Sequence, residues 1–274
     1  MTELFQAIIF GIVEGITEWL PVSSTGHMIL LNSFMPMNVS DAFMDMFLVV
    51  IQLGAIMAVV VIFWHNLWPF SFKRGTSFLR KDVWVMWFKV LVACIPAVVV
   101  ELIWGDVLED LFYNYVVVSV MLIVVGVLFI IAEVWNANRT PSMTGVAQIT
   151  YRAAFIIGLF QVVAAVFPGT SRSGATILGA LLIGVSRTAA AEFTFYLAVP
   201  VMFGASLIKV LEFGLSFTAA EIVILAAGML TAYIVSMLCI RFLMGYVRRH
   251  DFKIFGWYRI LLGTFVLLYF NLWV

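Results

Sequence analysis

Two polar clusters interrupt an otherwise apolar sequence, and both contain residue types that can act on phosphate groups. The first combines two carboxylates with a run of hydroxyls and one imidazole, and consists of Glu14, Glu18, Ser23, Ser24, Thr25 and His27. Carboxylates four residues apart lie on one face of a helix. Because each charge costs roughly 2.5–3.5 kcal/mol at membrane depth, intramembrane carboxylates are expected to be functional. Such a pair can hold a divalent cation, Mg²⁺ or Ca²⁺, and capping of buried donors is the structural alternative.

The second cluster is PGTSRSGAT, which runs from Pro168 to Thr176 and carries one cation, Arg172. Proline and glycine end one helix here, and the hydroxyls can cap the next, whose exposed amides form an anion site. A guanidinium beside that helix end suits phosphate oxygens. A salt bridge from Arg172 to Glu14 or Glu18 is the structural alternative, and the two roles are compatible. We expect both clusters to bind phosphate through Ser23, Thr25, Gly169, Thr170, Ser171, Ser173 and Thr176.

The two clusters lie in sequence segments that are copies of each other. GIVEGITEWLPVSSTG begins at Gly11 and GLFQVVAAVFPGTSRS begins at Gly158, an offset of 158 − 11 = 147. At this offset Arg172 stands opposite Thr25. One copy therefore supplies carboxylates and an imidazole, whereas the other supplies the cation. Two helix N-termini that converge with an arginine and several hydroxyls suit a multiply charged anion, such as a phosphate or diphosphate on a lipid.

The composition places these clusters in a membrane protein. Of the 274 residues, 64% are hydrophobic and 11% are charged, and the mean hydropathy is +1.13. Soluble domains are about 45–50% apolar and about 25% charged, so this chain has too few polar residues to cover a soluble surface. Lysine plus arginine equals aspartate plus glutamate at 15 each, and we therefore expect no nucleic-acid partner. Cys94 and Cys239 lie in apolar runs and are expected to be buried thiols.

Six apolar runs are long enough to cross a bilayer, at approximately 43–64, 83–104, 115–135, 189–210, 219–243 and 254–273. Two further apolar stretches are broken in the middle by Pro, Gly, Ser and Thr, at 4–20 with 25–37 and at 152–167 with 175–185. Each half is marginal or too short for a full crossing. A helix, a break and a second helix within one bilayer depth predict a re-entrant hairpin.

Each copy thus consists of one hairpin and three crossings, so the second copy must be upside down relative to the first. The predicted fold is an all-α integral membrane protein with six transmembrane helices and two re-entrant helix hairpins in an inverted-topology repeat. We expect one membrane domain, 1–274, with repeat halves at about 1–135 and 151–274 and a linker at 136–150. Such repeats place their site near the midplane, between the broken helices.

Charged residues in the connections predict the orientation. One side is basic and receives Lys73, Arg74, Arg80, Lys81, Arg139, Arg152, Arg248, Arg249 and Lys253. The other side is mainly acidic and receives Asp41, Asp106, Glu109, Asp110, Lys209 and Glu212. The positive-inside rule makes the basic side cytoplasmic. Both termini and the mouth of the first hairpin are then outside, and the site is expected to open extracytoplasmically.

The motifs resemble those of a known family. ExxxE from Glu14 to Glu18, PVSSTGH ending at His27, and PGTSRSGAT together resemble the undecaprenyl-pyrophosphate phosphatase (BacA/UppP) family, as do IQLGAI near Gln52 and GVSR near Arg187. The resemblance implies hydrolysis of undecaprenyl diphosphate to undecaprenyl phosphate and inorganic phosphate, which recycles the lipid carrier for peptidoglycan. It also implies a multi-pass protein of the bacterial plasma (inner) membrane, a divalent-cation requirement and a link to bacitracin resistance. Membrane lipid and a homodimer partner are further expectations.

The expected mechanism is in-line attack on the terminal phosphorus, catalysed by Glu14, Glu18, Ser24, His27 and Arg172. Ser24 activated by His27 is the favoured nucleophile. Direct attack by His27 and attack by bound water stay open. The rival function is a polyprenyl-phosphate flippase or other transporter that uses the same midplane site, because inverted repeats are typical of transporters. Two carboxylates beside an anionic cargo favour an enzyme, since without chemistry or a metal they would only repel it.

Overall fold

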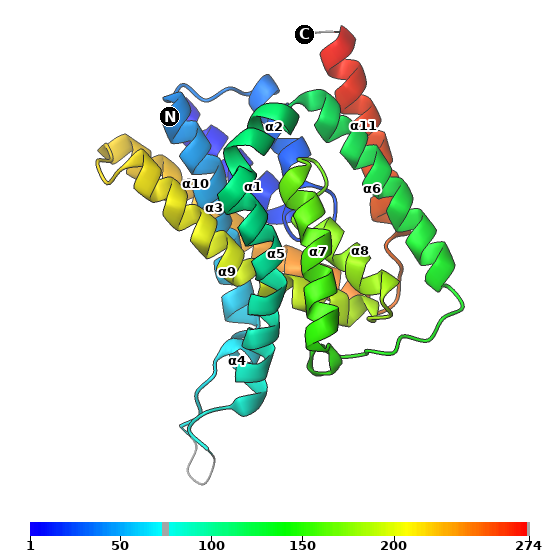
Figure 1. Cartoon of the computed structure of the whole chain (residues 1–274). Coiled ribbons are helices and arrows are strands. Elements are labelled where there is room, and N and C mark those ends of the chain that lie inside the picture. Colours follow the sequence, from blue (N-terminus) through cyan, green and yellow to red (C-terminus); the bar gives the residue numbers. More distant parts are fainter. Residues whose placement is uncertain (73–76, 273–274) are drawn as a thin grey trace.

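A computed structural model describes residues 1–72 and 77–272, which fold almost entirely as helices (Figure 1). In chain order the elements are α1 (Thr2–Thr17), α2 (Ser24–Phe34), α3 (Asp41–Ile62), α4 (Trp64–Leu67), α5 (Lys81–Phe112), α6 (Tyr115–Asn136), the 3₁₀ helix η1 (Val146–Gln148), α7 (Tyr151–Val166), α8 (Arg172–Leu182), α9 (Arg187–Phe213), α10 (Ala219–Tyr246) and α11 (Lys253–Leu272). Extended pairing within these ranges is limited to two isolated bridges, Phe70 with Leu79 and Met143 with Val185.

The six expected crossings are confirmed as helices long and apolar enough to span a membrane. They are α3, α5 over Lys81–Gly105, α6, α9, α10 and α11. Their outward surfaces carry large exposed apolar side chains, such as Leu102 on α5 and Leu238 on α10, as lipid-facing helices do. The protein is therefore a multi-pass membrane protein. Two residues of the basic side, Lys73 and Arg74, lie outside the described residues.

The two broken stretches form helix pairs of matching length. α1 and α7 have 16 residues each, and α2 and α8 have 11 each. At about 1.5 Å per residue, none of these four helices spans a hydrocarbon core of roughly 30 Å. The residue before each second helix, Ser23 or Ser171, has a positive φ, of 73° and 69°. These serines are the only non-glycine residues in the described ranges with that strained backbone.

The match between the copies needs one correction. Helix α2 begins at Ser24 and α8 begins at Arg172, so the copies differ by 148 positions after the break. Arg172 therefore corresponds to Ser24, and the expected match to Thr25 was wrong by one residue. Two residues separate Pro21 from the start of α2, whereas three separate Pro168 from the start of α8, and the additional residue is accommodated at Gly169, which adopts a φ of 89°. A Cβ at Gly169 would lie 2.6 Å from the Val118 carbonyl oxygen, so only glycine fits this turn.

Each helix pair packs on a long helix from the other half of the chain. α1 lies along α10, α7 lies along α5, and α6 lies along α11. Glycines permit these close approaches, because a Cβ at Gly11 would meet the Gly228 carbonyl oxygen and one at Gly158 would meet that of Ala93. In Figure 1, α1 begins and α11 ends toward the upper end, whereas α4 lies at the lower end. Reciprocal packing of this kind is what an inverted repeat predicts.

The core surrounds the second hairpin. Every residue of α8 from Ser173 to Leu181 is buried, whereas α2 buries only Gly26, Met28 and Leu30. The hairpins are thus alike in length but not in burial, and α8 forms a rigid wall against which the rest of the site is built. Cys94 and Cys239 are buried free thiols, as expected.

Candidate active site

Glu18 joins the two polar clusters. Its Oε2 accepts a hydrogen bond of 2.9 Å from the Ser24 hydroxyl, and its Oε1 pairs with the Arg172 guanidinium from the other half of the chain. The Ser173 hydroxyl donates to the Glu18 carbonyl oxygen at 3.1 Å. Glu18 is 7% exposed, so the pair lies in a site largely shielded from solvent. The expected salt bridge therefore exists, with Glu18 as the partner, and it brings carboxylate, hydroxyl and guanidinium into one unit.

His27 is held in one tautomer. Its Nδ1 lies 2.7 Å from the Ser23 carbonyl oxygen, and because a carbonyl only accepts, Nδ1 must carry the proton. Nε2 is then the acceptor for the Tyr258 hydroxyl, 2.6 Å away on α11. The two rings also stack, with centroids 5.6 Å apart and planes 5° from parallel. The unprotonated nitrogen of His27 therefore has a fixed direction, set by Ser23 on one side and Tyr258 on the other.

Arg259 forms hydrogen bonds to both breaks. This fully buried residue of α11 donates from Nη1 to the Pro21 carbonyl at 3.2 Å, and from Nη2 to the carbonyls of Gly169 at 2.8 Å and Thr170 at 2.9 Å. A turn without regular structure leaves its carbonyls unbonded, and in a membrane no water replaces those bonds. Arg259 thus supplies donors to both turns at once and fixes one relative to the other.

Sequence reasoning missed Tyr258 and Arg259. A signal for the second was present, because an arginine inside a predicted crossing is too costly to lack a partner or a function. Tyr258 gave no comparable signal, since tyrosines are common near membrane boundaries. Both belong to the last helix, far in sequence from either cluster, and only the fold places them here.

The remaining expected residues play unequal parts. The Ser171 hydroxyl caps α8 by accepting from the Gly174 amide at 3.1 Å, and it lies 3.1 Å from the Ser173 hydroxyl. Thr176 bonds to the Arg172 carbonyl and to Thr194, each at 2.9 Å, so its hydroxyl is used inside the protein. The other residues range from half-buried Thr25, on the first turn of α2, to the buried groups Ser23, Gly169 and Thr170.

Several buried polar atoms in this region have no hydrogen-bond partner. They include Oε1 of Glu14, the hydroxyl of Ser23 and the hydroxyl of Thr170. Glu14 is 1% exposed and lies one helical turn before Glu18. Buried groups without partners are costly, and their concentration around the breaks is typical of a site that a ligand completes.

These donors fit a divalent cation only in combination with a phosphate ligand. Within the part of the chain that the structure describes, no three residues among His, Cys, Asp and Glu gather as a metal cage. Mg²⁺, however, is commonly held by one or two carboxylates together with phosphate oxygens and water. The free oxygen of Glu14 beside Glu18 supplies a carboxylate pair of this kind.

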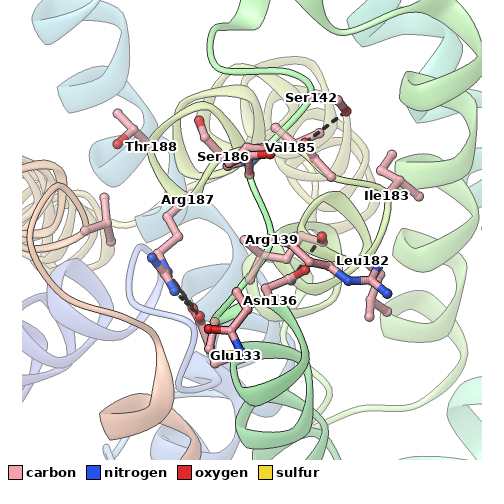
Figure 2. A pocket seen from close by; sticks show the side chains of 17 residues that line it. Glu133, Asn136, Arg139, Ser142, Leu182, Ile183, Val185, Ser186, Arg187 and Thr188 are labelled. Carbon is pink, nitrogen blue, oxygen red and sulfur yellow. Dashed lines mark hydrogen bonds and ion pairs between the residues drawn. The ribbon is translucent and has the colours of Figure 1, made fainter.

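A second polar region lies elsewhere. Figure 2 shows a pocket of about 690 Å³ where α6 ends and α9 begins. In it the Nε of Arg187 donates to both carboxylate oxygens of Glu133, at 2.9 and 3.0 Å, and the Phe252 amide donates to Glu133 at 3.0 Å. The arginine of the GVSR motif is therefore paired with a carboxylate that is itself fully bonded. This arrangement fastens α6, α9 and the start of α11 together, away from the two clusters.

Comparison with known proteins agrees with the geometry of the clusters. The sequence profile of the family described as bacitracin resistance protein BacA matches residues 7–265, nearly the whole chain. The chain belongs to the BacA family.

Among its BacA-family relatives is an undecaprenyl-diphosphatase of Desulfitobacterium hafniense, 61% identical over 99% of this chain and 97% of the relative. Undecaprenyl-diphosphatase 1 of Clostridium acetobutylicum is 60% identical over 98% of this chain and 97% of its own. An undecaprenyl-diphosphatase of Enterococcus faecalis is 56% identical over 97% and 96%. The family resemblance inferred from the motifs is therefore confirmed, and the similarity extends over nearly the whole chain.

Proposed function

We propose that this protein is an undecaprenyl-diphosphatase, which hydrolyses undecaprenyl diphosphate to undecaprenyl phosphate and inorganic phosphate. The observation that carries the proposal is the unit formed by Glu18, Ser24 and Arg172, because it combines a nucleophile, a base and an anion clamp from the two breaks. The full-length identity to proteins named undecaprenyl-diphosphatase supports the same substrate.

Arg172 and the N-termini of α2 and α8 bind the diphosphate in this mechanism. Both helices begin at the breaks that Glu18 joins, so their positive dipole ends lie next to the Arg172–Glu18 pair. The guanidinium, which pairs with Glu18 in the absence of substrate, uses its remaining N–H groups for phosphate oxygens. Charge neutralisation at the terminal phosphate accounts for most of the catalysis.

Ser24 is the proposed nucleophile, and Glu18 takes the place expected for His27 as its immediate base. The Ser24 hydroxyl already donates to Glu18, so its proton passes there as Oγ attacks the terminal phosphorus. The bond from that phosphorus to the bridging oxygen breaks, which releases undecaprenyl phosphate and leaves phosphoserine. Water then attacks the phosphoserine and gives a proton to Nε2 of His27, while Glu18 returns its proton to Oγ as the bond from Oγ to phosphorus breaks. This regenerates Ser24 and Glu18 and yields inorganic phosphate, to which His27 passes its proton.

A divalent cation completes the proposed site. Glu14 and Glu18 would hold it, and phosphate oxygens of the substrate would supply the remaining ligands. Bound there, the cation would supply positive charge to neutralise the diphosphate. The unpartnered Oε1 of Glu14 is the observation in favour of this role.

We also propose the membrane arrangement expected from the sequence. The helix pairs α1–α2 and α7–α8 enter the bacterial plasma membrane as re-entrant hairpins from opposite sides, within an inverted repeat. Their lengths and their reciprocal packing on α10 and α5 support this. The described basic residues Arg80, Arg139 and Arg248 flank ends of α5, α6 and α10, which makes that side cytoplasmic and lets the site open extracytoplasmically.

The test is release of inorganic phosphate from undecaprenyl diphosphate by purified protein in detergent, with Mg²⁺ or Ca²⁺ added. We expect release by the unmodified protein and none by Ser24→Ala. Trapping by acid quench should yield phosphate on Ser24, and a phosphopeptide from any other segment would contradict the covalent step. A folded protein that binds the lipid and moves it across vesicles without releasing phosphate would establish the flippase instead, which the reciprocal packing of the two halves favours.

A further inference from the structure

A groove is lined by residues of α5, α7 and α9 together with Arg172 of α8. Figure 1 shows α5 between α7 and α9. The groove has a volume of about 360 Å³, and we call it the lateral groove. Small residues make room for it, namely Ala97 on α5, Ala164 and Ala165 on α7, and Gly204 and Ala205 on α9. Large side chains at its edge, such as Leu102, are exposed and face lipid. The lateral groove is therefore a mainly apolar groove in the membrane-facing surface.

The lateral groove also has polar residues in its lining. Arg172 of the candidate active site lines it, beside Gln161 of α7. Gln161 is 2% exposed, and neither its amide nitrogen nor its amide oxygen has a hydrogen-bond partner. An amide buried in apolar surroundings without a partner is costly unless a ligand provides one.

The chemistry of the groove selects an amphiphile with one apolar chain and an anionic head. The guanidinium of Arg172 matches the head, and the alanine and glycine walls match a hydrocarbon. The volume lies near the lower limit of ligand pockets, about 300–1,000 Å³, which leaves room for a head-proximal segment of one chain while the remainder stays in the bilayer. A phospholipid, with a glycerol and two chains at its head, fits this shape less well.

We propose that the lateral groove binds the first isoprene units of the polyprenyl diphosphate, with Gln161 hydrogen-bonded to the lipid-side phosphate and the terminal phosphate beyond Arg172. This rests on the proposed function, and it adds the path by which the substrate chain leaves the active site. It makes Gln161 a substrate-binding residue. The lipid then enters sideways along the groove that α5, α7 and α9 form, and its chain does not need to leave the membrane.

The first experiment fills the groove without disturbing the fold. A Cβ at Gly204 meets no atom within 4 Å, so Gly204→Phe projects a ring into the lateral groove. The matched control is Gly245→Phe, because Gly245 lies on α10 outside the groove and its Cβ is equally free. Loss of burial for about two methylene groups predicts a KM for undecaprenyl diphosphate raised about tenfold in Gly204→Phe. The kcat should stay within about twofold, and the control should match the unmodified protein. An unchanged KM in Gly204→Phe overturns the proposal.

The second experiment tests the polar part of the lining. Gln161→Leu removes the unpartnered amide but keeps the volume, so the variant should be at least as thermally stable as the unmodified protein. Its KM should rise by about tenfold, the size expected for one lost hydrogen bond to a charged group. Equal KM values together with a raised melting temperature would show that Gln161 has no part in binding.

A third readout does not depend on turnover. A photoreactive polyprenyl phosphate, with the reactive group on its first isoprene unit, should label peptides of α5, α7 and α9 in detergent. Undecaprenyl phosphate should compete for this labelling, and Gly204→Phe should abolish it. Labelling of other helices, or equal competition by a bulk phospholipid, would overturn the groove assignment. If labelling succeeds and phosphate release fails in every condition, the proposed hydrolysis is wrong while the groove stands.

Discussion

At the scale of single residues, the site depends on Glu18 serving three partners at once. Its two carboxylate oxygens bond to Ser24 and Arg172, and its carbonyl oxygen accepts from Ser173. Each partner lies in the first turn of the helix that follows a break, Ser24 in α2 and the other two in α8. A carboxylate in this position holds the nucleophile and the anion-binding residue at fixed separation, so substitutions at either partner should affect catalysis more than folding.

Arg172→Lys separates charge from geometry at this position. Lysine keeps the positive charge beside Glu18 but lacks the planar fork that binds two phosphate oxygens. We expect kcat/KM for undecaprenyl diphosphate to fall about 10²–10³-fold, the range for losing a positioned donor to transition-state charge. Steady-state phosphate release measures this, with Arg139→Lys at the far side as the control. Activity of Arg172→Lys close to that of the unmodified protein would show that a point charge suffices.

Tyr258→Phe tests whether the hydroxyl orients His27. The variant keeps the ring that stacks on the imidazole and removes only the 2.6 Å hydrogen bond to Nε2. Because the imidazole then loses one of its two fixed contacts, we expect kcat to fall about tenfold while KM stays constant. A melting temperature measured in the same detergent controls for folding. If kcat is unchanged, Ser23 alone is enough to hold His27.

At the scale of elements, glycine contacts between helices hold each hairpin in place. Gly158 on α7 lies directly against the backbone of Ala93 on α5, and any Cβ there would overlap its carbonyl oxygen. The equivalent contact on the other side is Gly11 of α1 against Gly228 of α10. Helices in a membrane associate through such close backbone packing, since lipid offers no hydrophobic driving force between them.

Gly158→Ala should therefore push α7 away from α5. We expect a loss of about 1–3 kcal/mol of stability, typical of overpacking, with a lower melting temperature in detergent. Gly245→Ala is the control, because this glycine also lies in a helix but its Cβ meets open space. Alanine is the better helix former, so helix propensity alone would stabilise both variants. A control as unstable as Gly158→Ala would show that the contact with α5 is not the cause of the loss.

At the scale of the whole molecule, two halves of one chain complete one site. α11 contributes Tyr258 and Arg259. The end of α1 contributes Glu14 and Glu18, and the first turns of α2 and α8 contribute the proposed nucleophile Ser24 and the guanidinium of Arg172. The separation of these parts along the sequence means that the site exists only after the halves have packed together.

Removal of divalent cations tests the carboxylate pair. Chelation with EDTA should abolish phosphate release, and added Mg²⁺ or Ca²⁺ should restore it. Glu14→Gln keeps the shape of the side chain but removes its charge, so the variant should need a higher cation concentration for half-maximal activity. Full activity in EDTA would exclude the cation from the reaction and assign Glu14 to the positioning of Glu18.

Cysteine labelling tests the orientation. The native thiols Cys94 and Cys239 are buried, so they give little background. Leu215→Cys lies in the exposed connection between α9 and α10 and should react with a membrane-impermeant maleimide on intact cells. Asn138→Cys, in the exposed segment after α6, should react only after permeabilisation. The reverse pattern would place the site on the cytoplasmic side.

The amino-acid sequence determined the membrane class, the six crossings and the residues of the two clusters. Hydrophobic length alone specifies a crossing, and charged or hydroxyl groups inside an apolar run have few roles besides a site. The motif copies also predicted that the clusters belong together, although their register was wrong by one residue after the break. That error arose because one more residue stands between the proline and the helix start in the second copy, and the sequence around the break does not show which residue begins the helix.

Only the tertiary structure decided how the site is connected. Ser24 bonds to Glu18 rather than to His27, His27 is directed by Tyr258, and Arg259 bonds to both turns. The lateral groove likewise depends on small residues of α5, α7 and α9, which the fold brings together. Contacts between residues more than two hundred positions apart leave no periodic pattern in a single sequence. These contacts follow from helix packing, because the close glycine contacts help to determine which helix faces lie against each other.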